Sequence, residues 1–170
     1  MTKLLLIVPI VALSLAAQDN PLSSAVTTQF NMGKTNLVKA AEKMPEENYS
    51  FKPTDDVRSF GELVGHVANA QYSFCSAVAG EASPQKVNIE KEKKAKADLV
   101  QALKDAFAYC DKAYAGMTDA SAGQKVKFFG REQPKLAVLT FNNMHNYEHY
   151  GNIVTYMRLK KLVPPSSEGR

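Results

Sequence analysis

Two histidines four residues apart, His145 and His149, have the clearest chemical potential in this sequence. They belong to the motif HNYEH and make up two of the three histidines in the chain. On an α-helix such a pair is separated by about 40° around the axis and by one turn along it. Both imidazoles can then reach one ion, so the spacing predicts a two-nitrogen metal chelate. A chance pair on a solvated surface is the alternative.

The same stretch also spells H-x-x-E-H, the pattern of inverzincin peptidases, in which Glu148 would be the general base. Such peptidases take a third, acidic ligand from a downstream helix. Only 21 residues follow His149, and Glu168 is the sole acid among them. On the helical wheel Glu148 also lies on the flank of the histidine face. A peptidase is therefore not the favoured interpretation.

The third histidine, His66, lies at the edge of the apolar arc of another predicted helix, where it can face the protein interior. Three neutral imidazoles would make a metal site with an open position, suited to Zn²⁺, Ni²⁺ or Fe²⁺. Cys75 lies nine residues further on, about half a turn round the helix, which excludes it as a ligand. A hydrogen-bonded packing role for His66 is the alternative.

Three more polar residues share the sector of His145 and His149: Asn142, Asn152 and Tyr156. They are candidates to orient the histidines or to contact a substrate. Ordinary packing or exposure to solvent explains each of them equally well. Glu62 lies on the face of His66, but its spacing from Ser59 indicates a capping box at a helix start.

Four long helical patterns must position these side chains, which predicts an all-α protein with an up-and-down four-helix bundle. A proline-containing loop follows the first helix, and the segment containing VKFF is expected to form a loop with at most one minor strand. Pro134 suits the first turn of the last helix. The expected helices run from about Leu22 to Met44, from Ser59 as N-cap to about Ala79, from about Glu90 to Met117, and from Pro134 to about Leu162.

The start of the chain has the layout of a secretory signal: Lys3, an apolar run from Leu4 to Ala17, and small residues near its end. The run has 14 residues, whereas a membrane span needs roughly 20. We expect a signal peptide over residues 1–17 and one domain over 18–170; an uncleaved anchor or a buried helix is the alternative. In an exported protein, Cys75 and Cys110 are disulfide candidates, with two buried free thiols as the alternative.

The formal net charge of +4 is spread along the chain without a concentrated basic stripe, so nucleic acid is not an expected partner. No stable membrane span is expected after signal cleavage. The expected partner is a small molecule, and the sequence leaves a homodimer open.

Two separated stretches resemble the DinB/YfiT-like superfamily of four-helix-bundle proteins. Residues Tyr49 to Gln71 are similar to the family's loop and second helix, and His145 to Ser167 to its last helix with an H-x-x-x-H pair. The resemblance implies that His66, His145 and His149 bind a divalent ion such as zinc, nickel or iron. Many members continue the motif as His-Arg-Gly-Gln, whereas here Tyr150, Gly151 and Asn152 follow His149.

Characterised relatives include enzymes that use a low-molecular-weight thiol, a cytosolic cofactor that an export signal makes less fitting here. The expectation is therefore an exported, metal-dependent hydrolase or thiol-dependent transferase of unknown substrate. A non-catalytic metal-binding or interaction module with the same bundle is the alternative.

Overall fold

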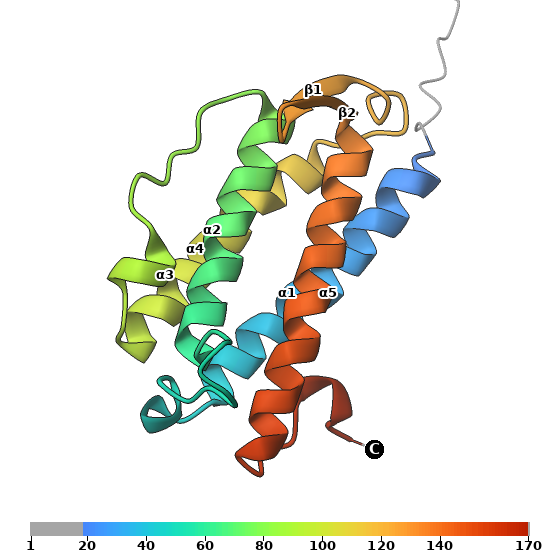
Figure 1. Cartoon of the computed structure of the whole chain (residues 1–170). Helices are drawn as coiled ribbons and strands as arrows, with labels where there is room; N and C mark the ends of the chain where they lie inside the picture. Colours follow the sequence, from blue (N-terminus) through green and yellow to red (C-terminus); the bar gives the residue numbers. More distant parts are fainter. Residues whose placement is uncertain (1–18, 170) are drawn as a thin grey trace, which may run out of the picture.

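Four long helices form a bundle in the computed structural model, which describes residues 19–169 (Figure 1). The predicted all-α four-helix bundle is confirmed. The predicted signal peptide, residues 1–17, lies outside the described residues. The four helices of the bundle are α1 (Pro21–Lys43), α2 (Phe60–Ala79), α4 (Lys96–Ala115) and α5 (Lys135–Leu159).

The helices do not alternate strictly up and down along the chain. Gly61 at the start of α2 lies beside Leu99 at the start of α4, and Cys75 is bonded to Cys110 further along both helices. Thus α2 and α4 run in the same direction, while α1 and α5 run the opposite way (Figure 1). The connection between α2 and α4 must therefore return the chain along the side of the bundle.

This return connection contains a separate four-residue helix, α3 (Ile89–Glu92), so the prediction of one helix from Glu90 to Met117 is wrong. Lys93 and Ala95 are extended and separate α3 from α4. Ile89 is buried, and its N–H donates to Asn69 Oδ1 on α2. These contacts hold α3 against α2, which a helix continuous with α4 would prevent.

A short antiparallel hairpin precedes α5, with strands β1 (Lys125–Phe128) and β2 (Arg131–Pro134). The prediction of at most one strand is therefore wrong. A two-residue turn joins the strands, and both of its residues, Phe129 and Gly130, have positive φ, as such turns require. Pro134 ends β2 and immediately precedes α5, one residue before the predicted place in the first turn.

The start of α2 is fixed by the predicted capping box, which is confirmed. Ser59 N–H donates to Glu62 Oε2, and Glu62 N–H donates to the Ser59 hydroxyl. The loop before it includes a short 3-10 helix, η1 (Glu46–Asn48), and Tyr49, whose buried hydroxyl donates to the Ala41 carbonyl. A second 3-10 helix, η2 (Pro165–Ser167), follows α5. In the described part of the chain, no helix has the length and apolar character to cross a membrane.

Candidate metal centre

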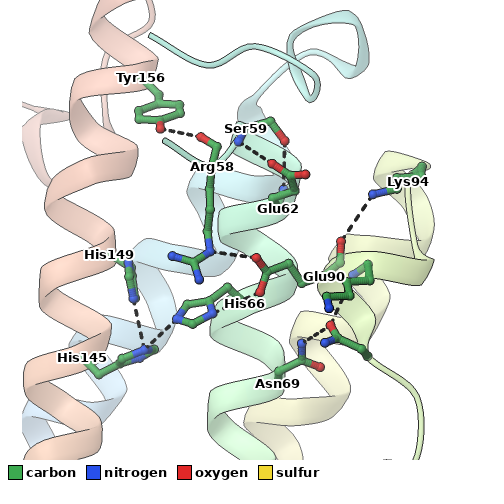
Figure 2. A network of polar contacts seen from close by, with 12 residues as sticks. Arg58, Ser59, Glu62, His66, Asn69, Glu90, Lys94, His145, His149 and Tyr156 are labelled. Atoms are coloured by element: carbon green, nitrogen blue, oxygen red, sulfur yellow. Dashed lines mark hydrogen bonds and ion pairs between the residues drawn. The ribbon is translucent and has the colours of Figure 1, made fainter. Parts of the chain in front are cut away.

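The three histidines of the chain meet between α2 and α5, where their Nε2 atoms converge (Figure 2). His145 Nε2 lies 3.1 Å from His66 Nε2 and 3.1 Å from His149 Nε2. All three candidate ligand atoms lie within 4.8 Å of one another. His66 and His145 are half-buried and His149 is buried, so the cluster is at the edge of the core.

The donor chemistry of this cluster fits a cation. When an imidazole is neutral, each ring has one protonated and one unprotonated nitrogen, and three unprotonated Nε2 atoms repel unless a proton or a cation lies among them. The opposite ring nitrogens, Nδ1 of His145 and of His149, are buried without a hydrogen-bond partner. A single divalent ion is a common partner for three such nitrogens.

The surroundings of the cluster keep the imidazoles neutral. Burial, together with the neighbouring His149 and His66, lowers the pKa of His145 to about 3. Burial also lowers the pKa of His149 to about 4. The pKa of His66 is lowered by burial and by the Arg58 charge, which the Glu90 carboxylate partly opposes. Neutral imidazoles are the form that binds metal ions, so the site suits ligation at neutral pH.

A chain of polar contacts leads away from His66 on its other edge (Figure 2). His66 Nδ1 lies 3.2 Å from Glu90 Oε2, and Arg58 Nε donates to Glu90 Oε1 at 2.8 Å. The Arg58 carbonyl accepts a 2.6 Å hydrogen bond from the Tyr156 hydroxyl. His66 is therefore held by a chain of contacts that includes residues from α3, from the loop before α2, and from α5.

Glu90 was not among the residues selected from the sequence. It lies 24 residues after His66 in a lysine-rich stretch that is typical of a solvated helix start. The one local signal for a separate helix here is Asn88. Its side chain caps α3 by accepting from the Lys91 N–H, so a helix begins just before Glu90. Because the sequence pattern predicts one continuous helix through this stretch, no local signal indicates that Glu90 lies beside α2.

A cavity of about 820 Å³ borders the histidine cluster at His149. It lies between the loop that precedes α2, the C-terminal half of α5, and Glu90 of α3. The lining is charged and polar on most sides. Its charged residues are Lys52, Arg58, Asp55, Asp56, Glu62, Glu90 and Glu148.

The other predicted residues of the site lie in two different places. Asn152, which is exposed, and Tyr156, which is buried, both line the cavity beside His149. Asn142 is fully buried and donates instead to Gln71 Oε1 and to the Tyr114 hydroxyl. Its contacts belong to a cluster of buried amides deeper in the bundle. Glu148 is exposed and lines the cavity without joining the three converging nitrogens.

The two cysteines lie near that amide cluster. A disulfide joins Cys75 on α2 to Cys110 on α4, with Cα atoms 5.3 Å apart. Both residues are buried. Neither cysteine belongs to the group of candidate metal ligands, which agrees with the position of Cys75 on the opposite side of α2 from His66.

Comparisons with known proteins agree with this architecture. YjoA, an uncharacterized protein of Bacillus subtilis, is 27% identical in an alignment of 143 residues that covers 80% of this chain and 89% of YjoA. Its crystal structure superposes with a TM-score of 0.67 at 22% identity and covers 86% of this chain and 99% of YjoA. A DinB-like protein from Bacillus cereus gives a TM-score of 0.72 at 16% identity, covering 84% of this chain and 95% of that one.

A variant of a mycothiol-dependent maleylpyruvate isomerase has a TM-score of 0.65 at 14% identity, covering 77% of this chain and 60% of the isomerase. At these identities, the solved structures show a common fold. The model of the DinB superfamily matches residues 29–153, most of the bundle with all three histidines. The chain therefore belongs to the DinB superfamily.

Proposed function

We propose that this protein binds one divalent metal ion, zinc, nickel or iron, through Nε2 of His66, His145 and His149. The observation that carries the proposal is the convergence of three buried or half-buried nitrogens within 4.8 Å. The low pKa values of His145 and His149 support it, because these imidazoles remain neutral at neutral pH without a bound ion.

We further infer that the protein is a metal-dependent enzyme, a hydrolase or a thiol-dependent transferase. A divalent ion supplies Lewis acidity, which polarises a substrate oxygen or favours the anionic form of a nucleophile. The cavity beside His149 supports an enzyme over a closed binding module, because catalysis needs space for a substrate at the ion. Its charged lining favours a small polar molecule.

The residues of the cavity have different expected tasks. The Tyr156 hydroxyl donates to the Arg58 carbonyl and so holds the loop before α2 against α5, at the wall of the cavity nearest to His149. Asn152 is exposed in the same wall and can contact a bound molecule. The name of the structural neighbour, a mycothiol-dependent isomerase, supports including thiol chemistry among the reactions tested.

The test of catalysis compares metal-loaded protein, metal-free protein and the His66→Ala variant in screens for ester and amide hydrolysis and for thiol conjugation. An enzyme is expected to show a turnover that requires both the ion and His66. Tyr156→Phe serves as a variant that keeps the histidines but removes the hydroxyl on the Arg58 carbonyl. If the metal-loaded protein has no activity, or if activity persists in metal-free His66→Ala, the proposed enzymatic function is wrong and the non-catalytic module is favoured.

Export is the second part of the proposed function. The buried disulfide between Cys75 and Cys110 supports it, because disulfides persist mainly in oxidising compartments. The protein expressed in a bacterium with its natural N-terminus is expected in the exported fraction, cleaved near Ala16 or Ala17. An intact N-terminus with both thiols reduced would contradict this proposal. The intact mass and a thiol-alkylation assay measure the two properties.

A further inference from the structure

Glu90 forms an ion pair with Arg58, but this pair does not account for its second carboxylate oxygen. Glu90 comes from the four-residue helix α3, yet its carboxylate reaches His66 on α2. The side chains of both partners are largely shielded, with 26% exposure for His66 and 21% for Glu90. A carboxylate held against the outer nitrogen of a candidate ligand is a typical support for a metal-binding histidine.

We propose that Glu90 is the positioning residue of the histidine cluster: it holds His66 in the Nδ1–H form, so that the lone pair of Nε2 faces His145 and His149. The metal-binding role of this cluster rests on the proposed function. The effect of Glu90 on the His66 ring is independent of any ion. Glu90 itself is not a ligand in this arrangement, because it contacts Nδ1, on the edge of the ring opposite to Nε2.

The proton arrangement follows from the partners of His66. A carboxylate can only accept, so the hydrogen bond at Nδ1 requires the proton to be on Nδ1. Nε2 of His66 is then unprotonated and can accept from His145 Nε2 across 3.1 Å in the metal-free protein. In water the neutral histidine side chain prefers the opposite tautomer, with the proton on Nε2. Glu90 therefore selects the form that a metal ion needs.

The carboxylate is itself fixed by its second oxygen. Arg58 Nε donates to Glu90 Oε1 at 2.8 Å, which leaves Oε2 for His66. Both partners of the carboxylate are cationic or neutral donors, so the anion is stabilised in this position. The glutamate thus couples the loop before α2 to the ring of a candidate ligand.

The backbone of α3 can approach α2 this closely because residue 65 is a glycine. A Cβ on Gly65 would lie 2.6 Å from Glu90 Cα and 2.9 Å from Glu90 N, closer than real contacts allow. Asn69 Oδ1 accepts from the Ile89 N–H, and Asn69 Nδ2 donates to Asn88 Oδ1. Gly65, which directly precedes His66, and Asn69, one turn further along α2, therefore set the distance from which Glu90 reaches His66.

The first experiment measures the tautomer of His66 in metal-free protein by long-range ¹H–¹⁵N NMR. The wild type is expected to show His66 as the Nδ1–H form. Glu90→Gln and Glu90→Ala are expected to shift it toward the Nε2–H form. Gly65→Ala is expected to cause a similar shift while retaining the carboxylate, because the added methyl group displaces α3.

The second experiment measures zinc affinity in competition with a chromophoric chelator. Loss of a partner of this kind typically weakens metal binding 10–100-fold, which is the expected result for both Glu90 variants. Two matched controls keep Glu90. Glu92→Gln changes an exposed acid on the same helix, whose side chain accepts from the Asn88 N–H. Glu148→Gln removes a charge beside His149 without touching His66 Nδ1. Both are expected to bind zinc within about threefold of the wild type.

The outcomes separate this inference from the proposed function. If wild-type protein binds none of zinc, nickel and iron but its His66 tautomer depends on Glu90, the metal proposal fails and the positioning role stands. The positioning role is overturned if folded Glu90→Gln keeps the wild-type tautomer and, where zinc binds, the wild-type affinity. It is also overturned if Glu148→Gln weakens zinc as much as Glu90→Gln, because charge alone then accounts for the effect. Far-UV circular dichroism establishes that each variant is folded.

Discussion

Two polar clusters lie between α2 and α5, and they differ in how their members are satisfied. The histidine cluster contains His66, His145 and His149. The amide cluster contains Gln71, Asn142 and Asn146, which are all fully buried. Both clusters combine one residue of α2 with a pair four apart on α5, and the two pairs interleave along that helix.

In the amide cluster, the side-chain amides form hydrogen bonds with one another. Gln71 Nε2 donates to Asn146 Oδ1 at 2.7 Å, and Asn142 Nδ2 donates to Gln71 Oε1 at 3.0 Å. Asn142 Oδ1 and Asn146 Nδ2 have no hydrogen-bond partner, but the other polar atom of each side chain is hydrogen-bonded to Gln71. In the histidine cluster, three equivalent nitrogens face one another and a cavity borders one of the rings. The amides hydrogen-bond one another in the core, whereas the histidines converge beside a cavity.

The largest expected effect comes from removal of the central histidine. His145→Asn deletes the nitrogen that lies 3.1 Å from both other Nε2 atoms. We expect zinc affinity to fall on the order of a thousandfold, about 4 kcal/mol, because a three-ligand site loses one ligand. The free energy of unfolding of the metal-free protein should change little. Isothermal titration and urea denaturation measure the two quantities; equal zinc affinity in variant and wild type would refute the role of His145.

The disulfide is expected to contribute next, and only to stability. It closes a loop with a sequence separation of 35 residues, for which the chain-entropy model gives about 3–4 kcal/mol. Cys75→Ala/Cys110→Ala should therefore lower the free energy of unfolding by this amount in urea. Reduced wild type is the matched control, because the chain has only these two cysteines. A loss below about 1 kcal/mol would contradict the expected contribution.

Gln71→Met should break the amide cluster while leaving the histidines in place. It removes the partner of Asn146 Oδ1 and the acceptor of Asn142 Nδ2, which costs about 2–3 kcal/mol of unfolding free energy. Gln101→Met is the control, since Gln101 is exposed on α4 and its side-chain amide donates to Asp105. Zinc affinity of the folded Gln71→Met variant should remain within about tenfold of the wild type. A larger loss of zinc than of stability would show that the clusters are one functional unit.

The smallest expected effect is a pH dependence of the metal-free protein. The pKa values of His145 and His149, about 3 and about 4, lie below the ordinary value of about 6.5 that applies in the unfolded chain. Above pH 6.5 both states are neutral and these groups contribute no slope. Below it the unfolded state binds protons first, so the free energy of unfolding falls as pH decreases toward 4.

The matched variant His145→Asn/His149→Asn lacks these two titrations, whereas its carboxylates are the same. Between pH 7 and pH 5, wild-type metal-free protein should lose about 1–2 kcal/mol more stability than this variant, a figure reduced for the partial exposure of His145. Urea denaturation with chelator at both pH values gives the difference. An equal loss in the two proteins would contradict the low histidine pKa values.

The sequence predicted the elements with a local signal. Ser59 and Glu62 marked the start of α2, and the spacing of His145 and His149 indicated a common face of α5. The position of His66 opposite that face could be inferred from the edge of an apolar arc and from the family resemblance. These features depend on helical periodicity, which is readable over a few residues.

The relative directions of the helices could not be predicted from helical periodicity. The parallel arrangement of α2 and α4 depends on the return of residues 80–95 along the bundle, and this return brings Glu90 to His66. Asn142 lies on the predicted side of α5, but its side chain donates to Gln71 on α2 and so belongs to the amide cluster. Contacts between residues far apart in sequence decide both cases, and no local pattern contains them.

Metal analysis of the untagged protein tests the central claim most directly. Protein purified without chelator, and again after reconstitution with zinc, nickel or iron, would be analysed by mass spectrometry for metal per chain, with His145→Asn treated in parallel. The account predicts close to one equivalent of a divalent metal in the wild type and almost none in the variant. Wild-type protein that retains less than about a tenth of an equivalent and takes up none on reconstitution would contradict it.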